Sequence, residues 1–310
     1  MAETSYLLEL SDYQNKNSKI NINSNEGMLT NYSFIHIIHI LYTYFVLINN
    51  NNNNIYSVYD VVEQVILSLL DCSRKREAGE LIDLLKLKFG KDSVRVQRLQ
   101  AMLYECQNVY SRANEIYSNI LEKYPADMLS MKRQIAILKS NGNYSQAITL
   151  LNTFLQIFMG DFEAWLELAS LHIRLLSYRN AAFCYEELIL IQPINHVLYS
   201  KYADIIYSIG GADNYIVALK YYTHSLELNI SNEPNNSYPP TNLSSIYGII
   251  MSMYAYCNSS GGSLAKLNEH QIELYNWAQN ELKQITSKYS PTKLPLVTAF
   301  INSTNIKQQD

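Results

Sequence analysis

The amino-acid sequence predicts an all-α fold, a solenoid of consecutive helical pairs, and three observations support this prediction. The 310-residue chain holds only 10 glycines and 7 prolines, fewer turn residues than β-sandwiches or glycine-rich loop enzymes usually need. Turns interrupt the apolar pattern too often for a continuous coiled coil. Similar residues recur every 34 positions, as alanines at Ala113, Ala147 and Ala181 and as bulky side chains at Tyr117, Leu151 and Tyr185.

A period of about 34 residues is typical of the tetratricopeptide repeat, a unit of two helices joined by a turn. The unit that begins at Phe162 fits this repeat well, with a Trp, a Leu, two small residues, an aromatic residue and a Pro at the required offsets. Those residues are Trp165, Leu168, Ala169, Ala181, Tyr185 and Pro193. His172 departs from the pattern, because it stands where a Tyr is usual.

Each of these residue types has a packing role in the predicted pair. Ala169 and Ala181 are small enough to let the two helices approach closely. We expect Trp165 and Tyr185 to fill the space on either side. Pro193 is expected to end the second helix, because proline has no backbone N–H to donate.

The preceding units fit the same frame less closely. The units from Val94 and Met128 place Ala113 and Ala147 at the packing position of the second helix. An earlier unit begins at about Tyr59. Terminal repeats are expected to be atypical, because they cap the stack.

The following unit carries an insertion. It begins at His196 and has Ala203 at the packing position of its first helix. Three extra residues around Gly210 and Gly211 delay the packing alanine of the second helix to Ala218.

These patterns divide the chain into five predicted parts and give five to six helical pairs. We predict an N-terminal region at 1–58, a tetratricopeptide-repeat solenoid at 59–230, a linker at 231–240, a degenerate C-terminal helical pair at 241–289 and a flexible tail at 290–310.

The segment 28–54 stands apart from the repeats. Residues 28–48 carry no Asp, Glu, Lys or Arg, and residues 49–54 are all asparagine. The apolar part is long enough to span a bilayer, but His36 and His39 interrupt it and no basic cluster flanks it. We therefore favour a low-complexity insertion, with a membrane span or a buried N-terminal helix as the alternatives.

The sequence contains no recognisable motif for catalysis, nucleotide binding or metal binding. It lacks a P-loop, a dinucleotide-binding glycine pattern and a serine-hydrolase elbow. His36 and His39 have helical spacing without a nearby carboxylate, and the four cysteines are too far apart for a zinc or redox motif. The net charge of −4 argues against binding nucleic acid through bulk charge. We therefore expect no enzyme activity, cofactor, metal or nucleic-acid partner.

The remaining candidate site is a groove lined by the first helix of each pair. Its N-terminal half is predicted to be basic and its C-terminal half neutral to acidic, which suits a peptide segment that is acidic at one end. The candidate residues are Arg95, Arg98, Lys132, Lys139, Glu163 and Asp204. The alternative is that these are ordinary solvated side chains. The Lys and Asn pattern of carboxylate-clamping, chaperone-binding repeats is absent, which disfavours a co-chaperone role.

Several stretches resemble one repeat family, subunit 2 of the endoplasmic reticulum membrane protein complex. The resemblance covers about residues 56–255 and is most specific at 161–190, which includes Asp161-Phe-Glu-Ala-Trp and Ala181-Ala-Phe-Cys-Tyr. Lys132-Arg-Gln-Ile-Ala and the Gly210-Gly211 insertion also belong to it. The apolar segment 28–48 departs from the family pattern.

This resemblance implies a non-catalytic scaffold, peripheral on the cytoplasmic side of the endoplasmic reticulum membrane. Such a subunit would organise the cytosolic side of the complex and support the insertion of tail-anchored and multi-pass membrane proteins. Its expected partners are the other subunits, through which it would reach the membrane indirectly. The alternative is a generic cytosolic repeat adaptor that binds a peptide segment of another assembly.

Overall fold

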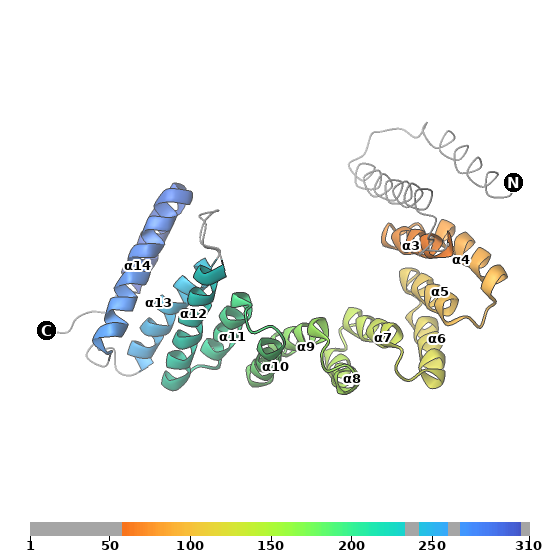
Figure 1. The fold of residues 1–310 in the computed structure, drawn as a ribbon, viewed down its shortest axis with the longest axis horizontal. Coiled ribbons are helices and arrows are strands. Elements are labelled where there is room, and N and C mark those ends of the chain that lie inside the picture. Colours follow the sequence, from red (N-terminus) through yellow and green to blue (C-terminus); the bar gives the residue numbers. More distant parts are fainter. Residues whose placement is uncertain (1–57, 233–241, 260–266, 305–310) are drawn as a thin grey trace. The chain divides into compact units, whose positions relative to one another are not determined.

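The computed structural model describes residues 58–232, 242–259 and 267–304, and these residues are almost entirely helical, with no strand (Figure 1). The predicted all-α fold is therefore confirmed. The apolar and Asn-rich segment 28–54, with His36 and His39, lies outside the described residues, as does most of the predicted linker 231–240.

The described helices follow one another as pairs joined by short turns. The pairs are α3 (Val58–Asp71) with α4 (Lys75–Phe89), α5 (Val94–Cys106) with α6 (Tyr110–Lys123), α7 (Met128–Ser140) with α8 (Tyr144–Ile157), α9 (Phe162–Arg174) with α10 (Tyr178–Ile191), α11 (His196–Ile209) with α12 (Ala212–Asn232), and α13 (Leu243–Ser259) with α14 (Glu269–Tyr289). A 3-10 turn η2 (Pro291–Lys293) and helix α15 (Leu294–Ser303) follow. The odd-numbered helices up to α13 are the first helices of their pairs.

The chain divides into two compact units, Met1–Ile137 and Leu138–Asp310. The boundary falls within α7, so the first unit ends and the second begins inside one helix. Within the second unit, each helix from α9 to α13 packs against the next one in the chain, as Figure 1 shows in green to blue.

The turn inside each of the first five pairs contains a residue with a positive φ. These residues are Ser73 (58°), Asn108 (64°), Gly142 (75°), Leu176 (58°) and Gly210 (78°). The last four are evenly spaced along the chain, at the same period as the packing alanines. Glycine adopts this conformation at little cost, whereas a side chain as large as that of Leu176 is strained there.

The alanines predicted to pack between helices have no exposed surface. Ala113 of the first unit has a relative exposure of 0%, and so do Ala147, Ala169, Ala181, Ala203 and Ala218 of the second. Around Ala113, the side chains of Tyr117, Ile120 and Ile137 complete one apolar cluster.

The aromatic residue near the start of a first helix ties that helix to the preceding turn. The indole N–H of Trp165 donates to the carbonyl oxygen of Met159 at 2.8 Å. The hydroxyl of Tyr199, one repeat later, donates to the carbonyl oxygen of Pro193 at 3.0 Å. Trp165 is half-buried and Pro193 is exposed, just beyond the end of α10, while Tyr185 is 8% exposed.

The C-terminal stretch 290–310, for which we expected a flexible tail, instead contains α15, so this expectation was wrong for residues 294–303. Val297 and Ile301, four residues apart, share one face of the helix and are buried. The hydroxyl of Tyr275 in α14 also donates to the carbonyl oxygen of Thr304. Burial of this apolar face stabilises a helix that is too short to be stable alone.

Among the described residues, no helix combines the length and the hydropathy that a bilayer crossing requires.

Candidate partner-binding surface

In the first unit, the predicted groove residue Arg95 is bound by two carboxylates of the preceding first helix. Its guanidinium donates to Asp60 of α3 at 2.6 Å and also to Glu63. The hydrogen bonds to Asp60 and to Glu63 raise the pKa of Arg95. Arg95 therefore links α5 to α3 rather than presenting an uncompensated cation.

A second link joins α5 to α7. Arg133 donates to both carboxylate oxygens of Glu105, at 3.1 and 2.6 Å, and the hydroxyl of Tyr117 donates to the same carboxylate at 2.6 Å. Burial, and then the hydrogen bond to Glu105, raise the pKa of Tyr117. Because Tyr117 belongs to α6, this partly buried cluster joins three helices of the first unit.

In the second unit, Lys139 forms an ion pair with Glu167 of α9. Lys139 stands one repeat period after Glu105, and Glu167 stands one repeat period after Arg133, so the two ion pairs occupy equivalent repeat positions. Their charges are reversed. In the first ion pair the earlier helix, α5, supplies the acid, whereas in the second ion pair the earlier helix, α7, supplies the base.

The predicted acidic residue Asp204 also has internal partners. It accepts a hydrogen bond from the hydroxyl of Tyr222 in α12 at 2.7 Å, and the ammonium of Lys201 lies 3.3 Å from its other oxygen. Burial, and then this contact with Asp204, raise the pKa of Tyr222. Glu163, in contrast, is exposed at the start of α9.

Arg98 and Lys132 are the two remaining candidates, and both belong to the first unit. Arg98 is partly buried, and its Nε atom is buried without a hydrogen-bond partner in the described part of the chain. Lys132 is half-buried in α7. At least three of the six predicted groove residues, Arg95, Lys139 and Asp204, are thus held by internal partners.

The sequence interpretation missed the acidic partners Asp60, Glu63, Glu105 and Glu167. The sequence did contain a signal for two of these ion pairs. Residues 28 positions apart in the sequence can lie side by side on successive first helices. Scanning the chain for opposite charges at this spacing would have found Glu105 with Arg133 and Lys139 with Glu167.

Among the described residues, no group of three His, Cys, Asp or Glu side chains is arranged to hold a metal ion. The four cysteines are free thiols. Burial raises the pKa of Cys184 to about 12, so this thiol is poorly suited to act as a nucleophile.

The chain is similar to proteins of one family. Residues 83–232 match the EMC2 TPR-like repeat domain. The chain is 52% identical over 247 residues to ER membrane protein complex subunit 2 of Dictyostelium discoideum, covering 79% of this chain and 76% of the relative. It is 36% identical over 224 residues to ER membrane protein complex subunit 2-A of Xenopus laevis, covering 72% and 71%.

Among solved structures, the C-terminal part of a TPR repeat-containing protein from Cytophaga hutchinsonii has a TM-score of 0.55. It covers 84% of this chain and 97% of its own at 11% identity, which is a likeness of fold alone. The sequence relatives carry the assignment, since the Dictyostelium protein matches over about three quarters of both chains. The chain therefore belongs to the family of ER membrane protein complex subunit 2.

Proposed function

We propose that this chain is a non-catalytic scaffold subunit of the endoplasmic reticulum membrane protein complex. The observation that carries the proposal is its family membership, at 52% identity to the Dictyostelium subunit. The helical repeats supply an extended side-chain surface, which suits a scaffold.

The finer proposal is that the chain works on the cytosolic side, where it supports insertion of tail-anchored and multi-pass membrane proteins. It would reach the membrane through the other subunits. Two features of the chain support a cytosolic location. The four cysteines are free, which fits a reducing compartment.

The second feature concerns N-glycosylation sequons. Asn229 and Asn242 each begin an Asn-X-Ser sequence but are only 7% and 3% exposed. The Asn242 amide also donates to the hydroxyl of Ser225 at 2.7 Å. A glycan on either asparagine would not fit the folded chain, so these two sequons favour folding outside the glycosylating lumen, whereas the exposed sequons at Asn143, Asn258 and Asn302 carry no such information.

The assembly is tested by purifying the tagged full chain from endoplasmic reticulum membranes in mild detergent, followed by mass spectrometry. We expect the other subunits of the complex in comparable amounts. Recovery of the chain alone, or with an unrelated assembly, would overturn the proposal in favour of a generic adaptor. Alkaline carbonate extraction should release the chain from the membranes, whereas retention in the pellet would contradict indirect attachment.

The insertion role is tested in microsomes that lack the endogenous subunit 2. Adding this chain should restore insertion of a tail-anchored reporter protein. If complexes reassemble with the chain but insertion stays at the depleted level, the scaffold proposal stands and the insertion role fails.

A further inference from the structure

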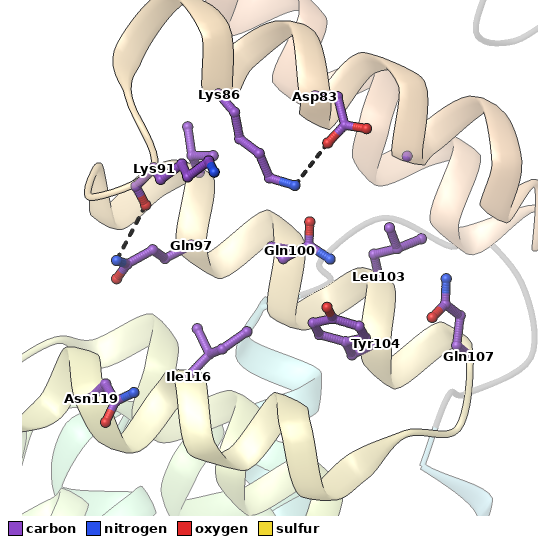
Figure 2. Close-up of a pocket in the computed structure, with 12 residues that line it drawn as sticks. Asp83, Lys86, Lys91, Gln97, Gln100, Leu103, Tyr104, Gln107, Ile116 and Asn119 are labelled. Atoms are coloured by element: carbon purple, nitrogen blue, oxygen red, sulfur yellow. Dashed lines mark hydrogen bonds and ion pairs between the residues drawn. The ribbon is translucent and has the colours of Figure 1, made fainter.

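A hollow of about 580 Å³ lies in the first unit, over the face of α5 that carries Gln97 and Gln100 (Figure 2). Helices α4 and α6 form its walls and α5 its floor. Its lining combines the apolar side chains of Val96, Leu103 and Ile116 with the amide side chains of Gln97, Gln100 and Gln107.

The two faces of α5 differ in how their polar groups are satisfied. At 100° per residue, Gln97 and Gln100 project on one face, which Gln107 continues just beyond the end of α5, and Arg95 and Glu105 project on the other. The charged face is paired with neighbouring first helices. The amide face is turned toward the hollow (Figure 2).

Three amides that line the hollow, two of them on exposed residues open to solvent, have no hydrogen-bond partner in the described part of the chain. They belong to Gln100, Gln107 and Asn119, while Gln97 uses one donor, to the carbonyl oxygen of Lys91 at 3.3 Å. Each amide presents both a donor and an acceptor. This is the combination that pairs with the N–H and C=O groups of an extended polypeptide.

Gly79 keeps the wall of the hollow open. It lies inside α4, where glycine is less stable than alanine. A Cβ at this position would meet only the Cδ2 of Leu103, at an ordinary 3.7 Å. Helix packing therefore does not require glycine here, and a larger side chain would occupy the hollow.

One end of the hollow carries a net positive charge. Lys86 is paired with Asp83 at 2.8 Å, and the exposed Lys91 adds a second cation beside them. The opposite end, at Gln107, carries no charged lining residue. This asymmetry complements a segment with an acidic residue at the lysine end and uncharged residues beyond it.

We propose that this hollow binds a short extended segment of a partner protein. The free amides hydrogen-bond its backbone, Lys91 binds an acidic side chain, and an apolar side chain rests on Leu103 and Ile116. Gln97 and Gln107 are ten residues apart, about 15 Å along the helix. That length matches about four or five residues of extended chain. The proposal is independent of which assembly the protein joins.

The test selects binders from a displayed library of random seven-residue peptides on the purified full chain and measures their affinities by fluorescence anisotropy. We expect selected peptides to share an acidic residue at one end followed by an apolar one. The Gly79→Leu substitution should weaken their binding at least tenfold, whereas the matched Gly79→Ala substitution should change it less than twofold. Circular dichroism should show both variants folded.

A second pair of variants tests the charge. The Lys91→Glu substitution should weaken binding about tenfold, whereas Lys88→Glu, an exposed change beyond the lining of the hollow, should not. The proposal is overturned if no peptide is selected, if Gly79→Leu binds the peptides like the unmodified chain, or if the chain's own residues 1–57, added as a synthetic peptide, compete for the hollow. Because only the purified chain is used, these outcomes are separate from the fate of the complex assignment.

Discussion

The ring of Tyr222 in α12 lies against the backbone of Gly248 in α13, so closely that a Cβ on Gly248 would come within 2.4 Å of the ring carbons. The hydroxyl of the same tyrosine donates to Asp204 in α11. One side chain thus connects three consecutive helices. Asp204, which the sequence suggested for partner binding, takes part in holding the C-terminal pair.

The Gly248→Ala substitution should therefore destabilise the protein. The added methyl group must displace the Tyr222 ring, which we expect to lower the free energy of unfolding by about 1–3 kcal/mol. Urea unfolding followed by circular dichroism measures this loss. Gly160→Ala is the matched control, because a Cβ there meets nothing within 4 Å. Equal stability of the two variants would contradict the contact.

Replacing Ala181 by leucine should overpack the contact between α9 and α10. Ala181 has no exposed surface, so we expect a loss of about 1–3 kcal/mol in the free energy of unfolding. Thermal unfolding provides the comparison, with Ala126→Leu at an exposed turn as the control. A neutral effect at position 181 would count against the repeat register.

Reversing one charge of the ion pair between Lys139 and Glu167 should lower the stability of the protein, and reversing both charges should recover it. Lys139→Glu places two carboxylates together and should cost about 0.5–1 kcal/mol, because the pair is partly exposed. Adding Glu167→Lys should restore most of that loss. Urea titrations of the single and double variants form the test, and a double variant no more stable than Lys139→Glu would show that the pair contributes nothing.

The buried thiol of Cys184 predicts a loss of stability at alkaline pH. Its pKa is raised by burial from 9.0 in the unfolded chain to about 12 in the fold. The resulting stabilisation is fully present below pH 9 and is lost as the pH rises toward 12, because only the unfolded state releases the proton there. Free energies of unfolding measured from pH 8 to 11 should fall less steeply for Cys184→Ala. Parallel curves would contradict the raised pKa.

Much of the fold followed from the sequence because the repeat supplies the same small residue at each close helix contact. Ala113, Ala147 and Ala181 mark the period, and glycine or asparagine marks most turns. The helix at 294–303 was missed because it is short and has no repeat partner in the sequence. Only its contacts with α14 distinguish it from a flexible tail.

The surface was harder to predict than the core. Arg95 and Lys139 were interpreted as groove cations, because their acidic partners lie 28 to 35 residues away in the sequence. The amide face of α5 was missed because the sequence interpretation considered the charged residues of the first helices, and glutamine side chains carry no charge. Gln97, Gln100 and Gln107 were visible in the sequence, but the hollow in front of them depends on how α4 and α6 pack beside α5.

We propose that the groove lined by the first helices of the pairs contacts the partner subunits of this scaffold, and Arg98 with Lys132 tests this proposal most directly. The variant with both Arg98→Glu and Lys132→Glu should release partner subunits when the tagged chain is purified from membranes, while circular dichroism shows that its helices remain folded. A matched variant with Arg179→Glu and Lys220→Glu, two exposed changes on second helices, should retain them. If the first variant keeps its partners even at raised salt, those two residues do not carry the contact and the contact surface lies elsewhere.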